Sequence, residues 1–468
     1  MTLIKSISGI RGTIGGRSGN SLSPIDAARF ASAYGAWVHS LISKKKKVVI
    51  GRDARLSGEM LSKIVASSLQ GMGLDVIDLG LSTTPTVEMA VTMEKAAGGI
   101  ILTASHNPIQ WNALKLLDEN GEFLSAKAGQ KILELAEKEE IDFVEVTELG
   151  KYSTNNTYFK KHIEAILKLP LVDKKAIEAK NFNIAIDCVN SSGGIVVPML
   201  LEALGVKNVT KLFCEPDGKF PHNPEPLPEN LTQISEEMKK NKHDLGIVVD
   251  PDVDRLCFVN EDGSMFGEEY TLVAVADYVL QNTPGNTVSN LSSTRALKDV
   301  TENHKGQYFA SAVGEVNVVT KMKEVKAVIG GEGNGGIILP ELHYGRDALV
   351  GIALFLTQLA KYGKPISALR NSFPSYQISK NKIELTPEID VDNLINEVRE
   401  KYKNQPINAV DGVRIDFDKQ WVHLRKSNTE PIIRIYAEAE TLAAADSLAN
   451  KIIADIREIL TKDAGILR

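Results

Sequence analysis

The sequence contains few cysteines, no long apolar run and no excess of positive charge. Its 468 residues include three cysteines, which are too few and too scattered for a disulfide framework or a zinc site. No run of about 18 apolar residues occurs, and residues 1–19 lack the apolar core of a secretion signal, so we expect a cytoplasmic protein without membrane contact. The 54 basic residues are outnumbered by 60 acidic residues, and the net charge of −6 argues against a nucleic-acid partner.

The apolar fraction of 43% suffices for several buried cores, and the order of the segments predicts an α/β fold. Short β-branched runs alternate with helical patterns over most of the chain. Ser23, followed by Pro24, is typical of a helix N-cap, and Ser57 is expected to cap a second helix. The expected strands are 48–50, 75–79, 99–102, 184–186, 245–249 and 327–329, and the expected helices are 24–42, 58–71, 196–204 and 271–280.

The C-terminal part of the chain follows a different pattern. Residues 413–417, 422–424 and 432–437 predict an antiparallel meander, and residues 441–460 predict a closing helix. We therefore expect four domains, three α/β units followed by a smaller α+β unit. Their predicted bounds are 1–153, 154–258, 259–372 and 373–468.

The first of four polar loops, Thr103-Ala104-Ser105-His106-Asn107-Pro108, follows the predicted strand 99–102. A serine displayed just after a strand suits a nucleophile or a phosphorylated hydroxyl. His106 could act as a base or as a hydrogen-bond partner of the serine, and Lys115 could return to the same site. An ordinary polar turn is the alternative.

The second loop, Asp250-Pro251-Asp252-Val253-Asp254-Arg255, follows the predicted strand 245–249 and carries aspartates at alternate positions. In an extended segment these side chains point to one side, so the carboxylates would converge on a hard cation, Mg²⁺ if the site handles phosphate. An EF-hand fits poorly, because Arg255 stands where that loop requires glycine. A phosphatase with an aspartate nucleophile and a capped acidic turn remain alternatives.

The third loop, Gly330-Gly331-Glu332-Gly333-Asn334-Gly335-Gly336, follows the predicted strand 327–329. Its glycines let a ligand approach the backbone closely. Glu332 and Asn334 supply a carboxylate and an amide, which suit sugar hydroxyls better than phosphate. A flexible turn is the alternative.

The fourth loop, Arg425-Lys426-Ser427-Asn428-Thr429-Glu430-Pro431, precedes Arg434. A guanidinium, two hydroxyls, an amide and several turn N–H groups would form a cup for a phosphate dianion. A polar hairpin is the alternative. The residues expected to bind this phosphate are Arg425, Ser427, Asn428, Thr429 and Arg434.

Taken together, the four loops supply an exposed serine, a divalent-metal site, a reader of sugar hydroxyls and a phosphate cup. Each comes from a different predicted domain. We therefore expect phosphoryl transfer on a phosphorylated sugar in a cleft between domains.

These residues resemble the α-D-phosphohexomutase superfamily, which comprises phosphoglucomutase, phosphomannomutase and phosphoglucosamine mutase. The resemblance covers nearly the whole chain and extends to Ser8-Gly9-Ile10-Arg11-Gly12, Gly51-Arg52-Asp53-Ala54-Arg55 and Phe220-Pro221-His222-Asn223-Pro224. It implies a heart-shaped arrangement of four domains, three related α/β units with mixed sheets and a smaller α+β C-terminal domain.

The resemblance also implies a role for each candidate residue. Ser105 would be the phosphoserine, and a phosphoserine oxygen would join Asp250, Asp252 and Asp254 as ligands of Mg²⁺. A bisphosphorylated sugar would serve as primer. The other residues with implied roles are Arg11, Lys115 and Arg255 around the transferring phosphoryl group, Glu332 and Asn334 at the sugar hydroxyls, and Arg425, Ser427, Asn428 and Thr429 at the non-reacting phosphate.

Two positions depart from better-known members of the superfamily. The third loop ends in Asn334-Gly335-Gly336, where Ser-Gly-His is common, and Glu315 stands where many members carry histidine. This form most resembles archaeal-type phosphoglucosamine mutases, so we expect interconversion of glucosamine 6-phosphate and glucosamine 1-phosphate by a monomer or homodimer. Glucose and mannose phosphates are the alternative substrates, and a metal-dependent sugar phosphatase or a non-catalytic phosphosugar binder are the alternative classes.

Overall fold

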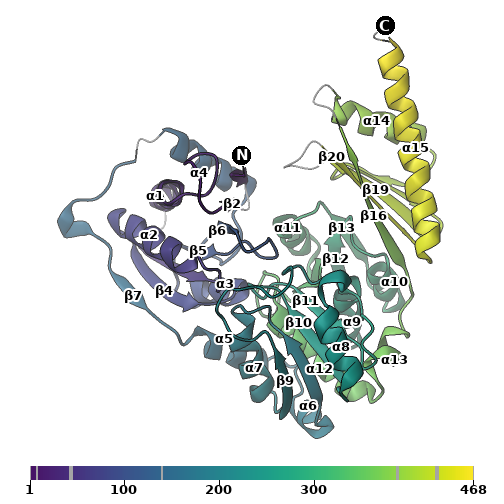
Figure 1. Cartoon of the computed structure of the whole chain (residues 1–468), viewed down its shortest axis with the longest axis horizontal. Helices are drawn as coiled ribbons and strands as arrows, with labels where there is room; N and C mark the ends of the chain where they lie inside the picture. Colours follow the sequence, from purple (N-terminus) through teal and green to yellow (C-terminus); the bar gives the residue numbers. More distant parts are fainter. Residues whose placement is uncertain are drawn as a thin grey trace.

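The computed structural model describes residues 2–6, 9–41, 46–138, 141–385, 389–426 and 432–466, with residues 462–466 described by their backbone alone. Four sheets, one in each of four consecutive bodies, organise this part of the chain (Figure 1). We number the bodies domains I to IV in chain order. Among the described residues, none of the helices is long and apolar enough to cross a membrane.

Domain I contains a seven-stranded sheet in the order β1-β2-β6-β5-β3-β4-β7. Its first helix begins as expected, because the Ser23 hydroxyl accepts a hydrogen bond from the backbone N–H of Asp26 and Pro24 takes the first helical position. The second helix also begins as expected, but Ser57 makes no capping hydrogen bond to it. The elements are β1 (Ile4–Ser6), β2 (Gly9–Thr13), α1 (Pro24–Ser40), β3 (Lys47–Arg52), α2 (Gly58–Gly71), β4 (Asp75–Leu81), α3 (Thr84–Met93), β5 (Gly98–Leu102), β6 (Trp111–Leu117), α4 (Ala126–Lys138), a 3₁₀ turn (Val146–Glu148) and β7 (Tyr152–Thr154).

Domains II and III each contain a four-stranded sheet, in the orders β11-β10-β8-β9 and β13-β12-β14-β15. Domain II comprises α5 (Tyr158–Leu167), α6 (Lys174–Lys180), β8 (Asn183–Asp187), α7 (Gly193–Ala203), β9 (Asn208–Leu212), a 3₁₀ turn (Pro228–Asn230), α8 (Thr232–Lys240), β10 (Leu245–Val249) and β11 (Leu256–Val259). Domain III comprises α9 (Glu268–Asn282), β12 (Asn286–Asn290), α10 (Ala296–Asn303), β13 (Tyr308–Ser311), α11 (Glu315–Val325), β14 (Ala327–Glu332), β15 (Gly336–Ile338), α12 (Ala348–Tyr362) and α13 (Ile366–Arg370).

The three α/β domains repeat one strand arrangement, which confirms that they are related units. In each, two parallel neighbours are followed by a strand that turns back antiparallel, as β3-β5-β6, β8-β10-β11 and β12-β14-β15. The turn before the antiparallel strand holds the serine loop in domain I, the aspartate loop in domain II and residues 333–335 of the glycine loop in domain III. The strand β14 runs three residues beyond the predicted end and includes Glu332. Three polar loops with unrelated sequences therefore occupy equivalent places in three equivalent sheets.

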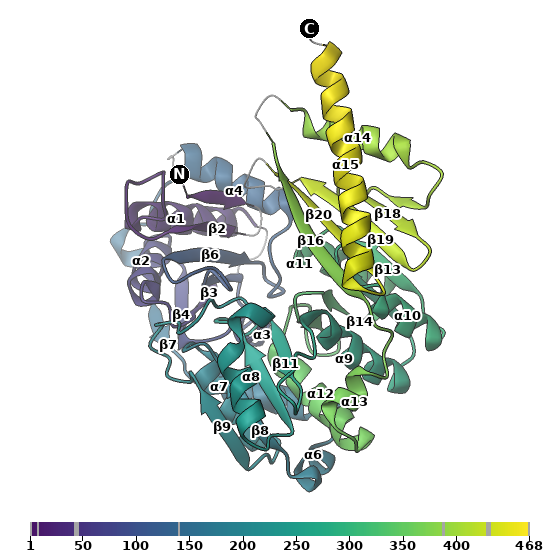
Figure 2. The same ribbon diagram turned by 45° about the vertical axis from the view of Figure 1, so that its right-hand side comes forward.

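Domain IV is an antiparallel sheet in the order β16-β20-β19-β18-β17 with α15 packed across it (Figure 2). The predicted meander is confirmed, since β18, β19 and β20 pair antiparallel in sequence. Strands β16 and β17 and helix α14 were not predicted from the sequence. The elements are β16 (Gln377–Glu384), α14 (Val391–Lys401), β17 (Ile407–Asn408), β18 (Val413–Phe417), β19 (Gln420–Lys426), β20 (Ile432–Ala439) and α15 (Leu442–Ile466).

The apolar cores group the domains unequally. One continuous core runs from Phe159 in domain II to Phe373 at the end of domain III, so these two domains are packed as one body. Domain IV has a separate core between its sheet and the helices α14 and α15. A domain with its own core can move relative to its neighbours without exposing theirs.

Candidate active site

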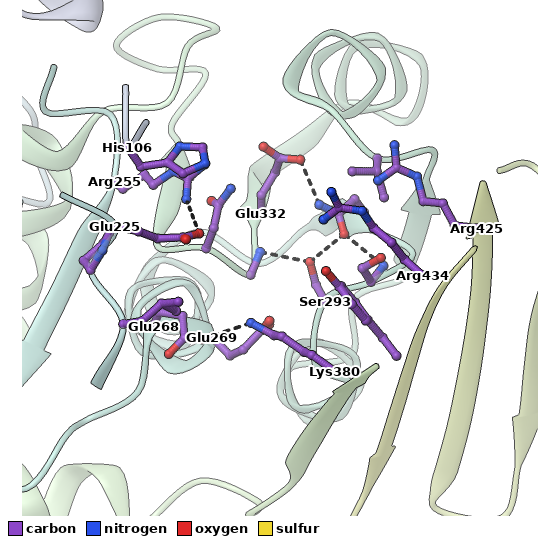
Figure 3. A pocket seen from close by; sticks show the side chains of 18 residues that line it. His106, Glu225, Arg255, Glu268, Glu269, Ser293, Glu332, Lys380, Arg425 and Arg434 are labelled. Atoms are coloured by element: carbon purple, nitrogen blue, oxygen red, sulfur yellow. Dashed lines mark hydrogen bonds and ion pairs between the residues drawn. The ribbon is translucent and has the colours of Figure 1, made fainter. Parts of the chain in front are cut away.

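The polar loops meet at two adjoining cavities of about 240 and 540 Å³, which share His106, Arg255, Val313 and Glu332 in their walls. The smaller cavity brings together side chains from domains I to IV (Figure 3). Of the predicted residues, the smaller cavity is lined by His106, Arg255, Glu332, Asn334, Arg425 and Arg434, and the larger by Arg11, Ser105, His106, Lys115, Arg255 and Glu332. Ser427, Asn428 and Thr429 lie outside the described residues.

Ser105 lies in the turn after β5 with its hydroxyl directed at the aspartate loop. Its Oγ donates a hydrogen bond of 2.8 Å to Asp250 Oδ2, and its backbone has a φ of +49°. His106 Nδ1 lies 3.4 Å from the same hydroxyl. Burial, together with Arg255 and Arg11, holds the pKa of His106 well below its usual range, so a neutral imidazole stands beside the serine.

The aspartate loop is a turn, and the predicted extended backbone is wrong. Val253 has a φ of +61°, and the backbone N–H groups of Asp254 and Arg255 both donate to Asp250 Oδ1 at 3.1 Å. The prediction that the three carboxylates converge is nevertheless confirmed, because one oxygen from each lies within 4.8 Å of the others. The three carboxylates therefore converge because the backbone turns, and not because they alternate along a strand.

The three aspartates fit a hard divalent cation. Asp252 Oδ2 accepts from Lys115 Nζ at 2.7 Å and Thr84 Oγ1 at 2.5 Å, but its Oδ1 is buried without a partner. The Oδ1 of Asp254 is buried and unpartnered in the same way. Burial and repulsion from the two neighbouring aspartates raise the pKa of Asp250 well above its usual range. A cation would satisfy the unpartnered oxygens and relieve this repulsion, and ligation by oxygen alone suits Mg²⁺.

Three of the predicted cationic side chains lie around Ser105 and the aspartates. Lys115 lies between Asp252 and Asp254, and its Nζ is 3.2 Å from Asp254 Oδ2. Arg11 donates to Asn107 Oδ1 at 2.8 Å, and burial lowers its pKa from the ordinary value. Arg255 is paired only loosely, at 3.4 Å from Glu225, and its Nε is buried without a partner. These charges suit the oxygens of a transferring phosphoryl group.

Glu332 already has partners for both carboxylate oxygens. Oε1 accepts from Asn290 Nδ2 at 2.8 Å and from the backbone N–H of Gly314 at 3.1 Å, and Oε2 accepts from Arg346 at 2.8 Å. In this conformation the carboxylate is therefore held by protein donors at the cavity wall, and a sugar hydroxyl would have to share or replace one of them.

Arg346 is a residue of this site that the sequence did not single out. Its guanidinium reaches three carboxylates from three segments, Asp254 at 2.7 Å, Glu332 at 2.8 Å and Glu315 at 3.0 Å. Arg346 thereby links the aspartate loop to the glycine loop. Glu315, whose position was noted in the sequence, is a partner of this arginine through both its backbone N–H and its guanidinium. The one local feature that could have drawn attention to Arg346 is its position next to Asp347, which caps the helix α12.

Arg425 and Arg434 face each other across β19 and β20 as directly paired residues at the wall of the smaller cavity. Arg425 Nε lies 3.1 Å from Asp411 Oδ2, so part of its charge is already balanced by the protein. Lys380, which the sequence did not indicate, lines the same cavity. The cavity wall also carries Glu268 and Glu269, and Lys380 lies 3.4 Å from Glu268, so Arg425, Arg434 and Lys380 form a group of cations beside these carboxylates (Figure 3).

The fold and the convergence of these loops define the class of protein. A solved phosphoglucomutase/phosphomannomutase family protein from Burkholderia thailandensis matches with a TM-score of 0.84 and 25% identity over 98% of each chain. The match spans all four domains, so the architecture is that of the phosphohexomutases.

Comparisons of sequence give the family. Models described as phosphoglucomutase/phosphomannomutase alpha/beta/alpha domains I, II and III match residues 3–142, 160–263 and 267–376, and the C-terminal domain model matches 388–455. A "Phosphoglucomutase/phosphomannomutase" of Thermococcus kodakarensis is 36% identical over 92% of this chain and 94% of its own. A "Probable phosphoglucosamine mutase" of Methanopyrus kandleri is 33% identical over 96% and 97%.

The chain belongs to the phosphoglucomutase/phosphomannomutase family, as the resemblance of its motifs indicated. It is therefore an enzyme of the phosphohexomutase class, an isomerase that acts as an intramolecular phosphotransferase.

Proposed function

We propose that the enzyme interconverts hexose 6-phosphate and hexose 1-phosphate through a phosphoserine at Ser105, with glucosamine phosphates as its preferred substrates. The observation that carries the proposal is the 2.8 Å hydrogen bond between Ser105 Oγ and Asp250, which joins the nucleophile to the aspartate cluster across two domains. We propose Mg²⁺ at Asp250, Asp252, Asp254 and a phosphoserine oxygen. When bound, it would supply positive charge to the phosphoryl oxygens.

The reaction would begin with phospho-Ser105 and a bound hexose monophosphate. A sugar hydroxyl attacks phosphorus, the bond from phosphorus to Ser105 Oγ breaks, and the sugar becomes a bisphosphate. Arg11 and Arg255 line the same cavity and balance charge on the phosphoryl oxygens, while Lys115 and the neutral His106 are the candidates for moving the proton.

The bisphosphate must then turn end for end and return its other phosphate to Ser105. The phosphate cup, with Arg425 and Arg434 as its described members, would hold the phosphate that does not react at each stage. The separate core of domain IV is consistent with an opening motion that lets the intermediate turn without leaving. A hexose bisphosphate would also prime an unphosphorylated enzyme.

The preference for glucosamine phosphates rests on the Glu332–Gly336 form of the glycine loop and on the name of the M. kandleri relative. The name of the T. kodakarensis relative favours glucose and mannose phosphates instead. A side-by-side assay of glucosamine, glucose and mannose 6-phosphates, each primed with its bisphosphate, distinguishes the two. We further propose a cytoplasmic monomer or homodimer that has neither nucleic-acid nor membrane partners.

A phosphatase that uses an aspartate of the triad as nucleophile is the second candidate for this site. Asp250 is disfavoured in that role because both of its oxygens are engaged, Oδ1 by two backbone N–H groups and Oδ2 by Ser105. Asp252 and Asp254 each keep one unpartnered oxygen, so they remain the candidate nucleophiles. Intact mass tests the choice. Incubation with a hexose 1,6-bisphosphate should add about 80 Da, one phosphoryl group, to Ser105. No addition, together with steady release of inorganic phosphate, would favour the phosphatase.

Replacing Arg425 by alanine should mainly raise KM for hexose phosphates. The loss of one charge-assisted hydrogen bond to phosphate predicts a rise of about 10- to 100-fold, with a much smaller change in kcat. Steady-state kinetics measure both. Arg457→Ala, which removes an exposed arginine of α15 in the same domain, is the matched control and should leave KM unchanged. An unaltered KM in the Arg425 variant would mean that the cup lies elsewhere.

A further inference from the structure

The segment Gly51-Arg52-Asp53-Ala54-Arg55 has no part in the reaction described so far, although the sequence singled it out. It begins in the last two residues of β3, and its residues 53–55 contact both the serine loop and the aspartate loop. Arg55 is 1% exposed and ranks among the largest fully buried side chains of the described chain. Within the described part of the chain, its only acidic partner is Asp53, which is buried as well. Burial of a guanidinium carries a desolvation cost that a single ion pair does not clearly offset, so the other contacts of Arg55 must be considered.

The guanidinium of Arg55 encloses the backbone of the serine loop. Three of its hydrogen bonds end on carbonyl oxygens of this loop, a fourth ends on the carbonyl oxygen of Trp111 at the start of β6, and the fifth, from Nε, ends on Asp53. All five N–H donors of the side chain are thus used. The contacts are Nη1 to the carbonyl oxygens of Pro108 at 2.8 Å and Trp111 at 2.9 Å, and Nη2 to those of Ser105 at 2.5 Å and Asn107 at 2.6 Å.

Asp53 fixes the other side of Ser105. Its Oδ2 accepts from the Thr103 hydroxyl at 2.7 Å, and the same hydroxyl oxygen accepts from the backbone N–H of Ser105 at 2.9 Å. The carbonyl of Ser105 is held by Arg55 and its N–H by Thr103, on either side of an α-carbon with a φ of +49°. A serine rarely adopts this conformation unless its surroundings impose it.

The same segment also contacts the aspartate loop. The backbone N–H of Ala54 donates to Ser191 Oγ at 3.2 Å, and the Ser191 hydroxyl donates to the carbonyl oxygen of Pro251 at 2.8 Å. All these groups are buried. Residues 53–55 therefore connect the loop that carries the nucleophile to the loop that carries the carboxylates, across the boundary between domains I and II.

We infer that Arg55 is a positioning residue for phosphoryl transfer, which imposes the left-handed backbone of Ser105 and so aims its hydroxyl at the aspartate cluster. This rests on the proposed role of Ser105. Arg55 lines neither cavity, so its replacement should leave phosphosugar binding intact and slow the transfer step alone. Lysine keeps the charge but has no planar fork with which to reach four carbonyls.

The test measures one half-reaction, in which a bond from phosphorus to Ser105 Oγ forms, the ester bond of glucose 1,6-bisphosphate breaks, and the serine proton passes to the sugar oxygen. Intact mass against time gives its rate for dephosphorylated enzyme, and calorimetry gives the affinity for hexose 6-phosphate. Arg55→Lys should lower the rate by about 100-fold, the scale of a misplacement near 1 Å, with affinity kept within about threefold. Arg52→Lys, which changes the half-buried arginine of the same segment, should match the wild type.

Two further variants separate positioning from a general loss of stability. Arg55→Ala should regain transfer rate when millimolar guanidinium is added, because the ion fits the vacated space, whereas an unfolded protein would not recover. Thr103→Val, nearly equal in volume, should slow transfer by about tenfold through the other side of Ser105. Wild-type transfer rates in folded Arg55→Lys and Thr103→Val would overturn the inference while leaving phosphoserine chemistry intact. A wild-type enzyme that never gains mass at Ser105 would instead overturn the proposed function.

Discussion

Replacing Ser105 by alanine is expected to abolish steady turnover while leaving phosphosugar binding largely intact. The hydroxyl is the atom that would receive and return the phosphoryl group, so its loss removes a covalent step that no neighbouring group replaces. A fall of at least about 10⁴-fold in kcat is expected, equivalent to more than about 5 kcal/mol of barrier. A coupled assay of hexose phosphate interconversion measures the rate, and calorimetry measures the binding.

Ser125→Ala provides the matched control for this experiment. Ser125 is exposed and lines the larger cavity together with Ser105, but its hydroxyl accepts from the backbone N–H of Ala128 and has no part in the proposed mechanism. Its replacement should leave kcat close to the wild-type value. Normal turnover in the Ser105 variant would remove the covalent intermediate from the mechanism and return the aspartate-nucleophile phosphatase to consideration.

The convergence of the polar loops could be predicted because each loop is marked by its local sequence. Each α/β domain places one loop between a parallel strand and the antiparallel strand that follows, and this loop is readable as a polar run after an apolar strand. Since the three domains repeat the same arrangement, their loops reach a common space. A polar loop at the same place in each of three repeated units is therefore a sequence feature from which their convergence can be predicted.

The roles of Arg346 and Arg55 could not be predicted from the sequence, and the physical reason is the same for both. Each arginine is defined by partners distant in sequence: Arg346 contacts Asp254, and Arg55 contacts the carbonyl oxygens of the serine loop. No local pattern specifies such contacts, because they depend on how whole domains pack. Glu332 illustrates the same limit, since its residue type suggested a sugar ligand but its neighbours occupy both oxygens.

The secondary structure missed in domain IV has a different explanation. Strand β16 reads Gln-Ile-Ser-Lys-Asn-Lys-Ile-Glu and is mostly exposed or half-buried, so its apolar alternation is weak. It is held in place by pairing along its length with β20. A strand specified by its partner rather than by its own composition is a tertiary feature, and sequence patterns do not detect it.

Asp252→Asn is the second substitution for which we expect a large effect. The carboxylate uses Oδ2 to hold Lys115 and Thr84, which leaves Oδ1 for the cation. An amide supplies one oxygen and two donors, so either Lys115 faces a donor or the cation loses its ligand. We expect turnover to fall by about 100-fold or more, about 2.7 kcal/mol of barrier, and Mg²⁺ binding to weaken.

The decisive measurement for Asp252→Asn is metal binding without substrate, because it separates loss of the cation from loss of a proton-transfer partner. Mn²⁺ can report on the site by electron paramagnetic resonance, with Mg²⁺ as competitor. Asp217→Asn removes an exposed aspartate of domain II whose nearest cation is Lys219 at 3.8 Å, and it should change neither binding nor rate. Unaltered metal affinity together with slow turnover would mean that Asp252 acts chiefly by holding Lys115, and that the cation rests on the other two carboxylates.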